Sequence, residues 1–219
     1  MIHLLPGNRA NIDSLSVPDF DWEQTRDEKD VKQWVNPEQT IALSTNFFKG
    51  KPDIPTTEDI NALRAYYRGQ IIGQKGGLIQ TDLTEIKGHT IIKTIFKFPQ
   101  SPSGTTYLSS LTIPFAKYSF VVKIQAMEAG HTGVRDNMIA NKLLRQGKIS
   151  TDEAGNFKGW SSDPYLKGFK EGNLMNLSEN QTYDNQFRMH PLSLSRNMLA
   201  KIEDEIAFSD SLKKLKPFG

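Results

Sequence analysis

Alternation of apolar and polar residues marks the middle of the chain as β-structure. It predicts four successive strands, over residues 78–86, 90–98, 105–113 and 118–127. In the last of these, Phe120, Val122 and Ile124 fall on one side, and Lys123 and Gln125 fall on the other. In the second, the apolar side is opposite two lysines and consists of Ile92, Thr94, Phe96 and Phe98, against Lys93 and Lys97. Short connections predict an antiparallel meander with one buried face and one face that is partly covered or wet.

Apolar residues spaced by three and four predict three helices, over residues 60–72, 133–146 and about 191–208. We expect Thr56 and Asp59 to form a capping box before the first helix. Thr132 is the expected N-cap of the second helix, and Pro191 fits the first turn of the third. The buried side of the second helix is expected to consist of Val134, Met138 and Leu144, together with Ile139 and Leu143. The sheet face that carries Phe96, Phe98, Phe120, Val122 and Ile124 is expected to meet the first and third helices.

The remaining segments lack strong periodicity. Residues 39–44 have strand character, and residues 1–35 are expected to form an irregular polar segment. Residues 148–189 are rich in Gly, Asn, Ser and aromatic residues, and we expect short helical turns there, held by the rings. Residues 209–219 are expected to form a solvated tail of a single domain spanning 1–219. The order of elements predicts the α+β class, an antiparallel β-meander sheet covered by helices.

Two resemblances accompany this prediction. The order of elements resembles the PsbP/Mog1-like arrangement, which implies an antiparallel sheet with helices packed on it. Over residues 60–207 the chain also resembles a family of uncharacterised bacterial proteins, in the strings Glu128-Ala129-Gly130-His131-Thr132-Gly133-Val134-Arg135-Asp136, Trp160-Ser161-Ser162-Asp163-Pro164-Tyr165, Asn176-Leu177-Ser178-Glu179 and His190-Pro191-Leu192-Ser193-x-x-Arg196. Neither resemblance implies an activity, because related folds carry unrelated functions.

Composition excludes several classes of site. The 219 residues include 27 Lys and Arg, 25 Asp and Glu, and no cysteine. Without cysteine there is no disulfide, thiolate metal site or cysteine nucleophile. The four histidines show no ligand spacing, so we expect no metal and no cofactor. The small net charge of +2 predicts no nucleic-acid partner. No segment resembles a signal peptide or a membrane span, which predicts a cytoplasmic protein that does not bind membranes.

The densest group of chemically active side chains follows the fourth predicted strand. Glu128, His131, Thr132 and Arg135 lie within nine residues, where the strand passes into a helix. One interpretation is an anion site, since helix N-termini attract anions and Arg135 could grip a carboxylate or phosphate. The simpler interpretation is structural, with Arg135 and Glu128 forming an ion pair that ties the strand to the helix.

Two other strings offer candidate binding residues. His190 and Arg196 flank the start of the last helix, and they would form either a small anion pocket or a helix-initiation motif. Trp160, Asp163 and Tyr165 would form either a turn, because Asp before Pro favours one, or an aromatic anchor for a partner protein.

These features predict a non-enzymatic protein-binding or interaction module, such as an adaptor, an assembly factor or an immunity-type protein. The alternative is an enzyme that acts on an anionic small molecule at the junction of Glu128, His131 and Arg135. An enzyme requires those side chains to converge on a concave site with a base within hydrogen-bonding reach of the substrate.

Overall fold

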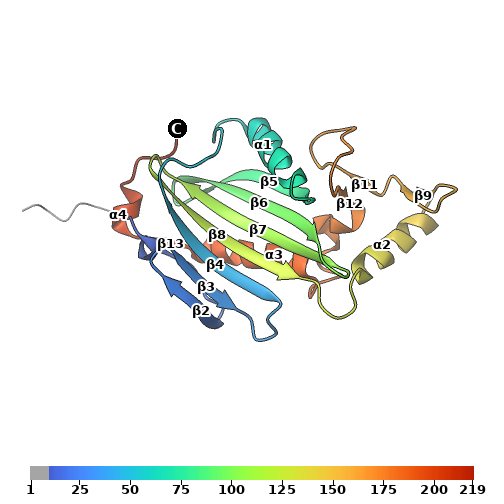
Figure 1. The fold of residues 1–219 in the computed structure, drawn as a ribbon, viewed down its shortest axis with the longest axis horizontal. Helices are drawn as coiled ribbons and strands as arrows, with labels where there is room; N and C mark the ends of the chain where they lie inside the picture. Colours follow the sequence, from blue (N-terminus) through green and yellow to red (C-terminus); the bar gives the residue numbers. More distant parts are fainter. Residues whose placement is uncertain (1–9) are drawn as a thin grey trace, which may run out of the picture.

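The computed structural model describes residues 10–219, and its centre is a seven-stranded antiparallel sheet (Figure 1). The strands lie in the order β2-β3-β4-β8-β7-β6-β5. Their bounds are β2 Glu23–Glu28, β3 Val31–Val35, β4 Ile41–Lys49, β5 Gly77–Ile86, β6 His89–Pro99, β7 Thr105–Pro114 and β8 Tyr118–Met127. The last four strands form the predicted meander, each paired antiparallel with the next. The α+β class and the antiparallel sheet are therefore confirmed.

Four α-helices and several short elements complete the fold. The helices are α1 Ile60–Ile72, α2 Val134–Arg145, α3 Pro191–Glu205 and α4 Asp210–Lys213. Three 3-10 turns are η1 Ile12–Ser14, η2 Leu177–Glu179 and η3 Gln181–Tyr183. Three two-residue strand pairs are β1 Leu15–Ser16 with β13 Ala207–Phe208, β9 Ser150–Thr151 with β10 Phe157–Lys158, and β11 Ser161–Ser162 with β12 Met175–Asn176. The helical turns predicted within 148–189 are thus present as η2 and η3. In the described residues, no helix has the length and apolar character that a membrane crossing needs.

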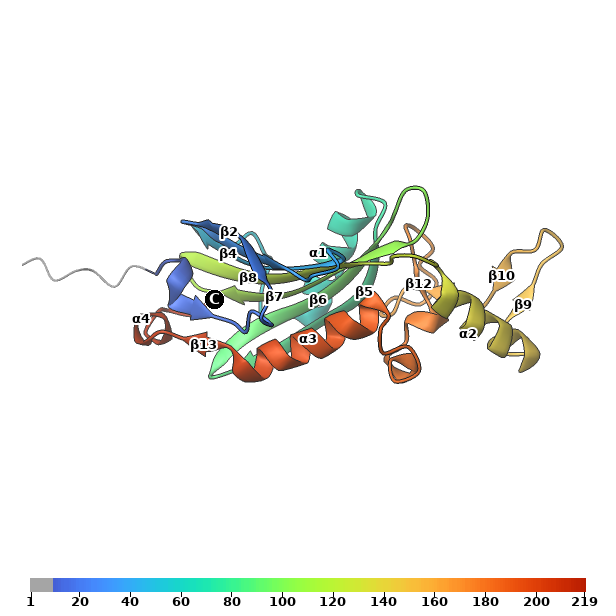
Figure 2. The same ribbon diagram turned by 90° about the horizontal axis from the view of Figure 1, so that it is seen from below.

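Helices α1 and α3 lie on opposite faces of the sheet (Figure 2). Leu199 and Ile202 of α3 pack in the main core with Phe120, Val122 and Ile124 of β8. On the other face, Ile71 of α1 packs in a second cluster with Phe96 and Leu78, and Phe98 lies against it. The sheet therefore has two apolar layers rather than one.

The prediction that Phe96 and Phe98 share a face with Phe120 is wrong. Phe96 pairs with Leu108, and Leu108 pairs with Gln125. Phe96 therefore lies in the row of Gln125, opposite the side that carries Ile124. Strand β6 is buried on both faces, so alternation within it could not indicate which apolar side meets α3.

The lysines of β6 lie opposite Phe96 and Phe98, as the alternation predicts, and so they lie on the face that α3 covers. Lys93 forms an ion pair with Glu203 of α3, and Lys97 forms one with Glu179 of η2. The side chains of Lys97 and Glu179 are only 5% and 1% exposed. The α3 face can bury these lysines because carboxylates from the covering segments neutralise them.

The irregular segment expected over residues 1–35 contains regular structure. Residues 1–9 lie outside the described part of the chain, but β2 and β3 extend the sheet beyond β4. Strand β2 reads Glu-Gln-Thr-Arg-Asp-Glu and is exposed along its whole length. Such an edge strand has no buried side, so it shows no alternation, and its charges discourage pairing with other chains.

The expected solvated tail is partly packed. Leu212 of α4 is fully buried in the main core. Beyond α4, the amide of Ala116 donates to the carbonyl of Lys216, and Phe115 bridges to Pro217. The lysine-rich composition of residues 213–216 predicts a solvated segment, and it gave no indication that Leu212 anchors α4 in the core.

Candidate functional site

Glu128 closes the junction where β8 passes into α2. One carboxylate oxygen accepts a hydrogen bond from the amide of Thr105, and the other accepts one from the amide of Gly133. Gly133 occupies the N-cap position of α2 with a φ of 70°, a left-handed conformation that favours glycine. The prediction that Thr132 caps α2 is therefore wrong. The hydroxyl of Thr132 instead lies 3.1 Å from that of Ser103.

His190 faces Glu128 from the start of α3. Its Nε2 lies 3.4 Å from a Glu128 oxygen, and both side chains are about nine-tenths buried. Its Nδ1 accepts a hydrogen bond from the amide of Leu192, so His190 is the N-cap of α3. The interpretation of His190 as a helix-initiation residue is confirmed. Because both ring nitrogens are engaged, His190 is poorly placed to take a proton from a substrate.

The pKa of Glu128 is lowered by its surroundings. Burial by itself raises the pKa of this carboxyl, but hydrogen bonds from His190, Gly133 and Thr105 outweigh it. Glu128 is therefore an ionised structural acceptor that joins β7, β8 and the starts of α2 and α3.

Arg135 is buried inside the protein and does not pair with Glu128. Its side chain is 1% exposed and forms an ion pair with Asp184 at 3.0 Å. It also donates to the carbonyls of Ser178 and Asn180 and to the hydroxyl of Ser193. The predicted pair of Arg135 with Glu128 is wrong, because Arg135 lies on the face of α2 that turns toward the 176–184 segment.

Arg196 completes the same cluster from α3. One terminal nitrogen lies 3.1 and 3.2 Å from the two Asp184 oxygens, and the other donates to the carbonyl of Glu179. Asp184 therefore lies between two guanidinium groups, those of Arg135 and Arg196. The two arginines considered as anion ligands therefore both bind a carboxylate of the protein itself.

Further polar residues extend this buried network beneath the junction. Glu179 binds Lys97 at 2.8 Å, and it also accepts from the hydroxyl of Tyr107 and the amide of Asn176. Asp136 of α2 accepts hydrogen bonds from Ser178 and Asn176. The spacing of Asn176 and Glu179 is a capping-box signal that the sequence displays, but the partner Lys97 lies 82 residues away from Glu179.

The string from Trp160 to Tyr165 lies elsewhere and is taken up by internal contacts. Asp163 binds Arg68 of α1 through two hydrogen bonds of 2.7 and 2.9 Å, and it accepts the amides of Tyr165 and Leu166 in the predicted turn. Trp160 packs against the apolar cluster of α2.

Tyr165 covers the outer edge of β5. Its hydroxyl accepts the amide of Thr81, and the Arg64 guanidinium stacks 3.8 Å above its ring. These contacts hold the 148–189 segment against the sheet, so the turn interpretation of the string is confirmed.

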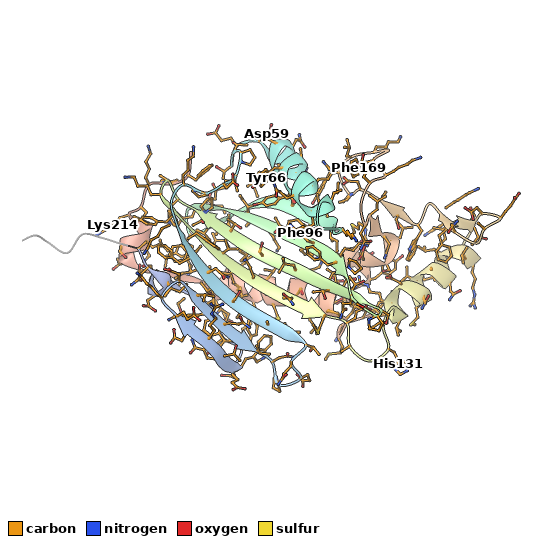
Figure 3. The ribbon with its side chains drawn as sticks, in the orientation of Figure 1. Asp59, Tyr66, Phe96, His131, Phe169 and Lys214 are labelled. Atoms are coloured by element: carbon orange, nitrogen blue, oxygen red, sulfur yellow. The ribbon has the colours of Figure 1, made fainter. Side chains whose placement is uncertain are left out.

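A pocket of about 520 Å³ opens at the junction, between the ends of β8, α2 and α3. Four of the sequence-predicted residues line it, namely Glu128, His131, Arg135 and His190. Thr132 lies beside the pocket, whereas Arg196, Trp160, Asp163 and Tyr165 do not line it. Of those four lining residues, only His131 is well exposed, and its side chain points away from the sheet (Figure 3).

The free surface of this pocket is largely apolar. Val134 and Met189 line it and are 45% and 81% exposed. Met138, one helical turn beyond Val134, is 58% exposed. The ring of Phe187 also lines the pocket and lies 5.7 Å from the Arg135 guanidinium, which it helps to cover. The prediction that Val134 and Met138 belong to the buried side of α2 is wrong, because both are exposed and the buried side is formed by Ile139, Ala140 and Leu143.

Comparisons with known proteins add no functional assignment. No family model and no curated protein matches the chain. A solved structure from Bacteroides thetaiotaomicron VPI-5482 matches with 14% identity and a TM-score of 0.35, over 53% of this chain and 39% of that one. A Pseudomonas aeruginosa protein of unknown function matches with 10% identity and the same TM-score, over 58% of this chain and 88% of that one. This chain thus spans about two fifths of the Bacteroides chain.

Proposed function

We propose that this protein is a non-enzymatic binding module that docks a partner protein at the junction pocket. One contrast supports the proposal. The charged side chains at the junction bind groups of the protein itself, whereas the exposed surface there carries Val134, Met138 and Met189. Exposed apolar side chains gathered beside a pocket are typical of protein–protein contact surfaces.

The alternative, an enzyme acting on an anionic small molecule, receives less support. The guanidinium of Arg135 already holds Asp184. Neither nitrogen of His190 is free, and Glu128 accepts hydrogen bonds from two backbone amides. A catalytic site requires a base that can reach a substrate atom, and among the described residues that line the pocket His131 is the one exposed side chain that could act as such a base.

The proposed partner is another protein, met in the cytoplasm. The near-neutral composition favours this over a nucleic acid. An adaptor, an assembly factor or an immunity-type protein would each use such a surface, because each acts by occupying a site on a partner rather than by chemistry.

Affinity capture from a lysate of the native cells tests the proposal. The double variant Val134→Ser, Met189→Ser removes two exposed apolar side chains without touching the buried network. We expect the wild-type chain to capture a partner that this variant loses. Phe48→Ser is the matched control, since Phe48 is 47% exposed on β4, away from the pocket. Equal capture by all three chains, or capture by none, would contradict the proposal.

A further inference from the structure

The exposed stripe of α2 is continuous with the junction pocket. Val134, Met138, Asn141, Lys142 and Arg145 are all exposed and recur at helical spacing, so they form one face of α2. From Val134 to Arg145 this face spans 12 residues and is about 17 Å long. A second hollow of about 510 Å³ lies along it, lined by Met138, Asn141, Lys142, Arg145 and Gln146. The junction pocket, which Val134 lines, and the second hollow, which Met138 lines, therefore follow each other along the helix.

The charge of this surface has one sign. Lys142 and Arg145 stand at one end of the stripe, and Arg188 lines the pocket at the other. Among the described residues, neither Lys142 nor Arg145 has an ion-pair partner. The single acid of α2, Asp136, is held by Ser178 and Asn176.

The acid that lines the pocket is also neutralised. Glu128 is the one carboxylate in the pocket lining, and it faces His190 and two backbone amides. An approaching chain therefore meets apolar side chains between Lys142 and Arg145 on one side and Arg188 on the other, with no free carboxylate on the described stripe itself.

We infer that the partner presents an acidic amphipathic segment, which lies along α2 between the junction pocket and Arg145. This inference rests on the proposed function and adds the chemistry of the partner. Apolar side chains of the segment cover Val134, Met138 and Met189, and its carboxylates face Lys142, Arg145 and Arg188. Complementary charge of this kind speeds association and sets the register of the bound segment.

Site-specific photo-crosslinking identifies what touches the stripe. The full chain carries benzoylphenylalanine in place of Met138, whose side chain is 58% exposed. After irradiation in native lysate, the crosslinked peptides are sequenced by mass spectrometry. We expect a peptide of net negative charge with apolar residues three or four apart. A basic or neutral peptide, a nucleic acid, a lipid, a second copy of this chain or no adduct would overturn the inference.

Binding of the identified peptide, made synthetically, then tests the role of the cations. We expect Lys142→Glu, Arg145→Glu to weaken binding about tenfold or more, and raised salt to weaken binding to the wild-type chain. The control Lys49→Glu, Lys51→Glu makes the same charge change at the last residue of β4 and just after it, at the strand end remote from the pocket, and should leave binding within about twofold. If Lys142→Glu, Arg145→Glu binds the peptide as well as the wild type does, the inference that the partner is acidic is overturned. If only Val134→Ser, Met189→Ser loses peptide binding, the docking site is still supported.

Discussion

The guanidinium of Arg135, in the first turn of α2, lies 3.0 Å from the carboxylate of Asp184, which is 49 residues further along the chain. This contact makes Arg135 a structural residue. The same carboxylate also binds Arg196 of α3, so one acid joins two helices through an irregular segment. The charged residues Arg135 and Arg196 therefore hold the junction together, and the exposed apolar side chains of Val134 and Met189 lie beside them.

Arg135→Ala is expected to destabilise the fold by about 3–5 kcal/mol, because removing one partner of a buried ion pair leaves the rest of the network uncompensated. Urea denaturation of the full chain measures this loss. Lys142→Ala, on the exposed face of the same helix, is the control and should change the free energy of unfolding by less than about 0.5 kcal/mol. A near-wild-type midpoint for Arg135→Ala would contradict the structural role.

Asp163 is expected to make stability depend on acid pH. Burial by itself raises the pKa of its carboxyl, but Arg68 and the amides of Tyr165 and Leu166 lower it below the ordinary value of 3.8. A carboxyl whose folded pKa is lowered stabilises the fold above its unfolded pKa, and this stabilisation is lost as the pH falls through the folded value. At pH 7, Asp163→Asn should cost roughly 1.5–3 kcal/mol. The difference between wild type and variant should shrink as the pH falls below about 4. A difference that stays constant down to pH 2 would show that the charge of Asp163 does not matter.

Tyr165→Phe is expected to free the amide of Thr81 while leaving the ring under Arg64. The loss of one hydrogen bond should cost about 0.5–1.5 kcal/mol. Native-state hydrogen exchange followed by NMR should show faster exchange at Thr81, with little change at Thr94, the paired residue on β6. Unaltered exchange at Thr81 would mean that the Tyr165 hydroxyl does not protect this edge.

Phe120→Ala is expected to cost about 3–5 kcal/mol, the range for truncating a fully buried phenylalanine. Phe48→Ala offers a matched comparison within the same sheet, because Phe48 is 47% exposed and should cost under about 1 kcal/mol. Denaturant titration measures the free energy of unfolding of both variants. Similar losses for the two variants would contradict the assignment of Phe120 to the buried face and Phe48 to the exposed face.

Local patterns of apolar residues were sufficient to predict where the first helix and the central strands begin and end. Helix α1 and strands β5 to β8 agree with the predicted ranges to within one or two residues. Strand β2 could not be predicted in this way, because neither of its sides is buried. The sequence pattern also assigned the two apolar layers of the sheet to a single face. Phe96 and Phe120 lie in different strands, and only the register between the strands shows that they are on opposite faces of the sheet.

The sequence predicted where the residues of the candidate site lie, but it did not predict which groups they bind. The sequence put Glu128, Arg135 and His190 at element boundaries, where the structure has them. Their partners depend on how residues 176–184 fold, and that segment has no periodic pattern. Proximity along the chain therefore suggested an ion pair between Arg135 and Glu128. In the structure Arg135 pairs with Asp184 instead, and the same carboxylate also binds Arg196.

The separate anchoring of α2 bears on the order in which the protein opens. Apart from the buried network, α2 packs on a small cluster of its own, formed by Ile139, Ala140, Leu143 and Ile149. Elements that contribute little to the main core open at a lower free energy than the sheet. We expect the amides of α2 to exchange through sub-global unfolding while those of β8 exchange only when the whole fold opens. A partner bound along α2 would then protect this cooperative unit most, so the docking element would also be the part of the chain whose stability a partner controls.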